Sequence, residues 1–123
     1  ELMRRGSRCP TIAESRTVKE ALLAITEARA GAIAITDHEG RIAGIFTDGD
    51  LRRHLALRPD LLDRVAIGTV MTRSPTTVSP GCLVSEAARI LREKKIDELP
   101  VVDLDGRPVG MIDVQDILAV GLA

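Results

Sequence analysis

The chain has 123 residues, 45% of them hydrophobic and 28% charged, with a formal net charge of −1 at pH 7. These values are typical of a folded globular domain, and no apolar run is long enough to cross a bilayer. The acidic balance and the single aromatic residue, Phe46, argue against a nucleic-acid partner, which normally meets a basic face or stacking aromatic side chains. We therefore expect neither a nucleic-acid nor a membrane partner.

The sequence contains two copies of one unit, related by an offset of 66 residues. Between Ile12 and His54, nine positions are identical to their counterparts, without a gap. In the first copy they are Val18, Glu20, Ala21, Glu27, Asp37, Gly40, Arg41, Gly44 and Asp50. Apolar positions agree more widely, so both copies are predicted to share one fold.

The first copy begins with a short extended segment at 11–13, followed by a helix. Apolar residues from Val18 to Ile25 recur at helical spacing, and Thr17 with Glu20 forms the pattern of a capping box.

Two short strands, 32–36 and 41–47, then flank a tight turn that ends in Gly40. Glycine tolerates the positive φ that such a turn requires. A second helix is predicted to begin near Asp48.

Residues 58–69, with Pro59 and a charged run, are predicted to form a linker. The second copy repeats the order: an extended segment at 77–79, a helix, two strands at 99–102 and 107–113, and a closing helix from Val114. Its first helix lacks a capping side chain because Leu83 stands at that position. The inward-facing residues predicted for the two closing helices are Leu51, Leu55, Ile117 and Leu118.

Each copy ends in the pattern Gly-h-h-x-x-x-Asp-h, where h is apolar, at Gly44 to Leu51 and Gly110 to Ile117. This motif and the duplicated β-α-β-β-α order resemble the CBS-domain pair, also called a Bateman module. The resemblance covers essentially the whole chain. It implies an α+β fold of two repeats related by a pseudo-twofold axis, with repeat 1 at 1–57, the linker at 58–69 and repeat 2 at 70–123.

The string from Gly44 to Arg53, Gly-Ile-Phe-Thr-Asp-Gly-Asp-Leu-Arg-Arg, is similar to the C-terminal CBS pair of KpsF/GutQ-type sugar-phosphate isomerases. Those enzymes interconvert D-arabinose 5-phosphate and D-ribulose 5-phosphate at the start of Kdo synthesis for lipopolysaccharide or capsule. Their chemistry belongs to a separate N-terminal sugar-isomerase (SIS) domain, which nothing in this chain resembles. The resemblance implies a cytoplasmic parent enzyme and a regulatory role for this region.

Carried over from CBS modules, Thr47 would contact a phosphate and Asp50 the ribose hydroxyls. The start of a helix offers free amides and a positive dipole end to a phosphate, and Arg52 and Arg53 lie in the next turn. Both Thr47 and Asp50 also suit a helix start without any ligand, as a cap and as an acidic first-turn residue.

The second copy departs from this pattern, because Asp113 stands where Thr47 stands in the first. A carboxylate there would repel a phosphate, so that cleft is either empty or holds an uncharged group or a cation. Asp116 is predicted to contact the ribose in this second cleft. The residues predicted to flank a base are aliphatic: Ile12 and Ala13 in the first copy, and Val78 in the second.

Cys9 and Cys82 have neither metal-site spacing nor the number needed for a disulfide framework, so we expect free thiols in a reducing cytoplasm. No metal site is expected either, because His38 and His54 lie in different predicted elements. The chain opens with Glu1 instead of Met, which suggests a piece of a longer polypeptide.

No catalytic arrangement is evident, so we expect a regulatory module without a cofactor of its own. Its ligand would be an adenine nucleotide, by CBS habit, or CMP-Kdo, the activated product of the pathway. The expected partners are the SIS domain and a second copy, joined through apolar helix faces. Two alternatives remain open: a structural dimerisation module with degenerate clefts, and a CBS pair from another parent such as a transporter or dehydrogenase.

Overall fold

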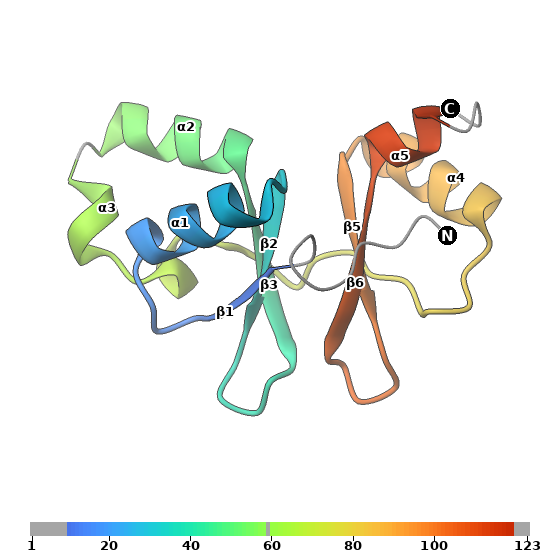
Figure 1. Cartoon of the computed structure of the whole chain (residues 1–123), viewed down its shortest axis with the longest axis horizontal. Coiled ribbons are helices and arrows are strands. Elements are labelled where there is room, and N and C mark those ends of the chain that lie inside the picture. The colour runs from blue at the N-terminus through green and yellow to red at the C-terminus, as the bar shows by residue number, and fades with distance from the viewer. Residues whose placement is uncertain (1–9, 59, 120–123) are drawn as a thin grey trace.

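The computed structural model describes residues 10–58 and 60–119, apart from the side chain of Leu61. The two repeats lie side by side, with their strands facing one another in the middle and their helices on the outer and upper sides (Figure 1). A pseudo-twofold axis relates them, so the predicted α+β architecture is confirmed.

The first repeat consists of β1 (Thr11–Ala13), α1 (Val18–Ala28), β2 (Ala32–Thr36), β3 (Ile42–Thr47) and α2 (Asp48–Leu57). β1 pairs in parallel with β2 because α1 crosses over between them, and β2 pairs antiparallel with β3. Thr17 accepts a hydrogen bond from the backbone N–H of Glu20, and the Glu20 side chain accepts one from the backbone N–H of Thr17. The predicted capping box is therefore confirmed.

The second repeat consists of α4 (Val84–Lys94), β5 (Glu98–Val102), β6 (Pro108–Asp113) and α5 (Val114–Ala119). The counterpart of β1 is reduced to one parallel bridge between Val78 and Val101. Leu83 precedes α4 without a side-chain cap, as predicted.

The two repeats agree in their backbone details as well as in element order. Arg29 and Lys95, which follow α1 and α4, are both left-handed, with φ values of 55° and 56°. The turn glycines Gly40 and Gly106 have φ values of 82° and 83°, which confirms why glycine is needed there. These pairs are all 66 positions apart in the sequence.

The connection between the repeats contains α3 (Leu61–Arg64), the 3₁₀ turn η2 (Ile67–Thr69) and β4 (Thr72–Arg73). β4 pairs with β3, so the first sheet has the order β1-β2-β3-β4. Residues at the start of the second copy in sequence thus complete the sheet of the first.

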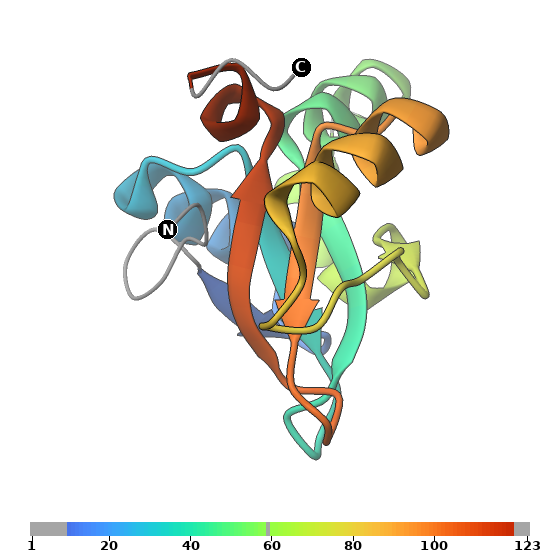
Figure 2. The ribbon, with the colours of Figure 1, turned by 90° about the vertical axis from the view of Figure 1, so that its right-hand side faces the viewer.

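Each repeat has its own apolar core, and the sheets meet through a third cluster. Ala32, Ala34 and Ile45 of the first sheet pack against Met111 of the second. The hairpins also meet near their tips, where the backbone N–H of Ile42 donates to the carbonyl of Gly106 at 2.7 Å. Figure 2 shows the two hairpins converging at the lower end of the molecule.

One predicted inward residue is wrong. Ile117 of α5 is fully buried, whereas the side chain of Leu118 is 50% exposed. Consecutive helical residues point about 100° apart, so both cannot face the same core. None of the helices among the described residues is both long enough and apolar enough to span a membrane.

Candidate functional site

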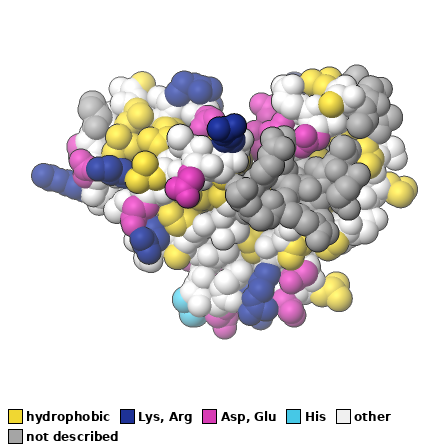
Figure 3. Space-filling view, viewed as in Figure 1, with side chains coloured by type: hydrophobic (Ala, Val, Ile, Leu, Met, Phe, Trp, Pro, Cys, Tyr) yellow, Lys and Arg dark blue, Asp and Glu magenta, His cyan; other side chains and the backbone are white. Residues whose placement is uncertain are grey.

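A cleft opens where the start of α2 faces the turn between α4 and β5. We call it the first cleft. It is lined by Gly31, Ile45, Thr47, Asp48, Gly49, Asp50, Arg52, Arg53, Thr72, Lys95, Ile96, Asp97 and Glu98. Its volume of about 440 Å³ lies within the range of small-molecule sites. Figure 3 shows acidic and basic side chains gathered at the notch between the upper ends of the two repeats.

Thr47 and Asp50 form a second capping box at the start of α2. The Thr47 hydroxyl oxygen accepts from the backbone N–H of Asp50 at 3.0 Å, and the Asp50 carboxylate accepts from the backbone N–H of Thr47 at 2.9 Å. The capping role is therefore real. It leaves the Thr47 hydroxyl proton free to donate, since only the oxygen is used as an acceptor.

All four residues predicted to contact the ligand from the start of α2 line the first cleft. Arg53 forms an ion pair with Asp50, and its guanidinium is largely exposed. Arg52 is exposed, and Lys95 adds a third positive charge from the facing turn. The cleft thus combines hydroxyl, carboxylate and cationic groups within reach of one small molecule.

The equivalent position in the second repeat holds a smaller pocket, which we call the second cleft. Its volume is about 100 Å³, and it is lined by Arg29, Ala30, Gly31, Ala32, Glu98, Met111, Asp113 and Gln115. The Asp113 carboxylate accepts from the backbone N–H of Gln115 at 2.7 Å, while Asp116 Oδ2 accepts weakly from the Asp113 N–H at 3.4 Å. Asp113 thus caps α5 through a different contact from the one Thr47 makes in α2.

Three residues predicted to flank a base do not line either cleft. Ile12 and Ala13 belong to β1, which lies on the far side of β2 from β3. Val78 packs into the core of the second repeat. Ile45 of β3 and Thr72 of β4 line the first cleft instead. No periodic pattern marked Thr72 in the sequence, because β4 is only two residues long.

Glu98 is the residue of this region that sequence reasoning missed. It lines both clefts, and burial together with the facing Asp113 raises its pKa from 4.5 to about 7. The sequence did hold a signal for Glu98: it stands 66 positions after Ala32, so a carboxylate replaces a small apolar residue of the first copy. Ala32 is buried in the structure.

The described residues contain no group of three or more His, Cys, Asp or Glu side chains placed to hold a metal ion. His54 stacks on Phe46 with ring centroids 6.2 Å apart, and His38 lies exposed in the hairpin turn. Cys82 is a free thiol whose pKa is raised by burial, while Cys9 lies outside the described residues. His38, His54 and Cys82 line neither the first cleft nor the smaller pocket of the second repeat. Packing or exposure accounts for their positions.

Comparison with known families identifies this architecture. A family model of the CBS domain matches the chain twice, at residues 1–57 and 67–122. The chain is a CBS-domain pair. The two matched segments correspond to the two repeats, and the first cleft of this CBS pair lies at their junction.

The CBS pair is similar to part of the arabinose 5-phosphate isomerases. It is 38% identical over 122 residues to arabinose 5-phosphate isomerase KdsD of Pseudomonas aeruginosa, which is 99% of this chain and 37% of that protein. It is 35% identical over 121 residues to arabinose 5-phosphate isomerase GutQ of Escherichia coli K12, covering 98% of this chain and 37% of that protein. The CBS pair therefore spans little more than a third of the length of these relatives.

Among solved structures, the CBS pair is similar to CBSX2, a CBS-pair protein from Arabidopsis thaliana, crystallised in complex with AMP. The AMP complex superposes with a TM-score of 0.81 at 27% identity, covering 98% of this chain and 92% of that one. That relative is thus a CBS pair of nearly the same extent with a nucleotide bound.

Proposed function

We propose that this CBS pair is the nucleotide-sensing regulatory module of a cytoplasmic arabinose 5-phosphate isomerase. The observation that carries the proposal is the first cleft, where Thr47, Asp50 and two arginines line one volume of about 440 Å³. The AMP complex of CBSX2 supports a nucleotide as the ligand class. The identity to KdsD and GutQ supports the parent enzyme.

The groups of the first cleft suit the separate parts of a nucleotide. The positive dipole end of α2 favours a phosphate, and the Thr47 hydroxyl and the guanidinium of Arg52 are donors for it. The Asp50 carboxylate is an acceptor for paired ribose hydroxyls, and Ile45 offers an apolar surface to a base. An adenine nucleotide and CMP-Kdo both meet these requirements.

In the parent enzyme the chemistry would belong to a separate SIS domain, and this chain alone would show no isomerase activity. Ligand in the cleft would change the activity of that domain through a coupling free energy. Such coupling is reciprocal, so substrate bound to the catalytic domain would change nucleotide affinity by the same factor.

The proposal predicts a thermal shift. A nucleotide at about 100 times its dissociation constant stabilises the folded state by about 2.7 kcal/mol. For a domain of this size that corresponds to a rise in Tm of roughly 10 °C. AMP, ADP, ATP, CMP and CMP-Kdo should be compared by differential scanning fluorimetry on the wild-type chain.

Two variants locate the effect. Asp50→Ala removes the ribose acceptor and Thr47→Val removes the phosphate donor at similar size, so both should lose the shift. Asp116→Ala, the equivalent change beside the second cleft, is the matched control and should keep it. If no nucleotide raises the Tm of the wild type, a purely structural dimerisation module becomes the better account. The small volume of the second cleft already favours that account for the second repeat.

A further inference from the structure

Glu98 and Asp113 face one another across two paired strands at the junction of the clefts. β5 and β6 are antiparallel, and their register places Glu98 directly opposite Asp113. Two like charges at such a position destabilise a strand pair. In the first repeat the same cross-strand pair is Ala32 and Thr47, which carries no charge.

The Glu98 carboxylate lies at the wall that the two clefts share. A Cβ built on Gly31 would be 3.1 Å from Oε2 of Glu98 and 3.7 Å from Oδ2 of Asp113. Gly31 lines both clefts, and so does Glu98. Both carboxylates thus lie close to Gly31, between the first and the second cleft.

The surrounding charges oppose ionisation of Glu98. The carboxylates that raise its pKa come from its own turn, from β6 and from the start of α2: Asp97, Asp113, Asp48 and Asp50. The cations that line the clefts are Arg29 after α1, Arg52 and Arg53 of α2, and Lys95 after α4. Among the described residues, none of these cations forms an ion pair with Glu98, whereas Arg53 is already paired with Asp50.

We propose that Glu98 is a specificity-determining residue of the first cleft, which admits a phosphate-bearing ligand with uptake of a proton at this carboxyl. The inference rests on the proposed nucleotide site. A phosphate entering the cleft adds negative charge to a wall that already holds several carboxylates. Protonating Glu98 removes one of those charges, so the protonated form binds the anion more tightly. Each additional phosphate on the ligand increases the effect.

The test uses AMP as the probe, with adenosine as its uncharged counterpart, by isothermal titration calorimetry. Because Glu98 has a pKa of about 7, AMP affinity of the wild type should fall by up to about tenfold between about pH 6 and about pH 8, the full factor applying if only the protonated form binds. The phosphate of AMP titrates near pH 6 itself. The readout is therefore the difference between the wild type and Glu98→Gln, an isosteric variant that cannot ionise.

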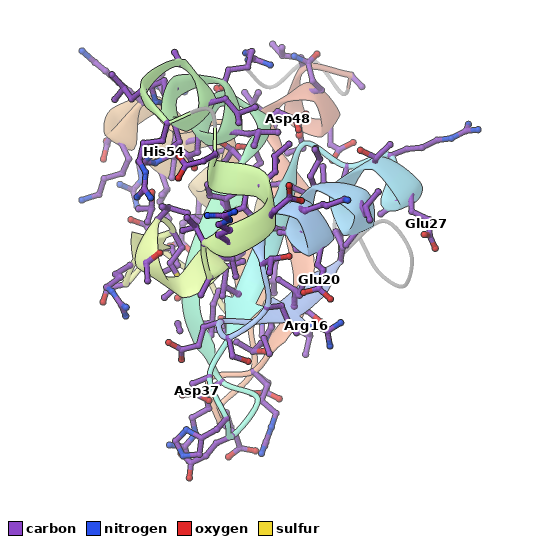
Figure 4. The ribbon with its side chains drawn as sticks, turned by 90° about the vertical axis from the view of Figure 1, so that its left-hand side faces the viewer. Arg16, Glu20, Glu27, Asp37, Asp48 and His54 are labelled. Atoms are coloured by element: carbon purple, nitrogen blue, oxygen red, sulfur yellow. The ribbon has the colours of Figure 1, made fainter. Side chains whose placement is uncertain are left out.

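Proton uptake is measured directly by repeating the titration at neutral pH in buffers of different ionisation enthalpy. The wild type should take up a fraction of a proton with AMP and none with adenosine, and Glu98→Gln should remove the part due to the protein. Glu27→Gln is the matched control, since Glu27 points outward from α1 (Figure 4), and it should behave as the wild type.

The pH dependence of the Tm without ligand tests the ionisation of Glu98 separately from binding. The pKa of Glu98 is raised from 4.5 to about 7 in the folded chain, so its contribution to stability is fully present below pH 4.5 and is lost as the pH rises through 7. The Tm of Glu98→Gln should therefore exceed that of the wild type increasingly from acidic to mildly alkaline pH.

The outcomes are distinct. Binding of AMP that depends on Asp50 but takes up no more protons in the wild type than in Glu98→Gln would overturn this inference and leave the proposed function intact. Greater proton release in the wild type than in Glu98→Gln would also overturn it. Absence of AMP and CMP binding at every pH would overturn both proposals.

Discussion

Single residues fix the geometry at the first cleft, and Gly44 is the clearest case. A Cβ built on Gly44 would lie 2.7 Å from the carbonyl oxygen of Thr72 and even closer to the side chain of Met71. β4 can therefore pair with β3 at this point only because Gly44 has no side chain. The same pairing brings Thr72 to the cleft.

Gly44→Ala should therefore destabilise the chain by about 1–3 kcal/mol, because β4 or the Met71 side chain must move. Denaturant unfolding measures the change. Gly81→Ala is the control, since nothing lies within 4 Å of its added Cβ, and it should stay within about 0.5 kcal/mol of the wild type. Equal stability of Gly44→Ala and the wild type would show that β4 does not lie this close to Gly44.

Among the elements, α4 and α5 leave apolar surface that the second repeat does not cover. Leu118 of α5 is half exposed. An open groove of about 400 Å³ runs between α4 and α5, and its lining residues are Ala88, Leu91, Arg92, Lys95, Ile96, Asp97, Val114 and Ile117. Helix faces of this kind are the basis on which we expect a homodimer.

A dimer through these helices should sediment at twice the chain mass at micromolar concentration, and Leu118→Asp should shift it toward monomer by placing a charge in the interface. Leu104→Asp is the matched control, because Leu104 is fully exposed in the turn between β5 and β6, away from the helices. A wild-type chain that remains monomeric throughout that range would rule out this assembly.

At the scale of the whole molecule, the internal repeat made most of the fold predictable. The period of 66 residues, the turn glycines and the helical spacing from Val18 to Ile25 each depend on local physics that the sequence displays. β4 was not predictable, because two residues carry no periodicity and their pairing with β3 is decided by how the chain returns.

The cleft was predictable in part for the same reason. Thr47 and Asp50 are close in sequence at a helix start, so their proximity follows from local geometry. The approach of Glu98 to Asp113 depends on the register of two strands, and its place beside the first repeat depends on how the sheets face one another. Such contacts arise only in the assembled pair.

The central claim is that the first cleft binds a nucleotide, and chemical-shift mapping tests it most directly. The ¹⁵N-labelled chain would be titrated with AMP and followed by its backbone amide resonances. The account predicts that the largest shifts fall at 45–50, at Thr72 and at 95–98, the segments that line the first cleft. Saturable shifts confined to another surface, or no shifts at millimolar AMP and CMP, would contradict it.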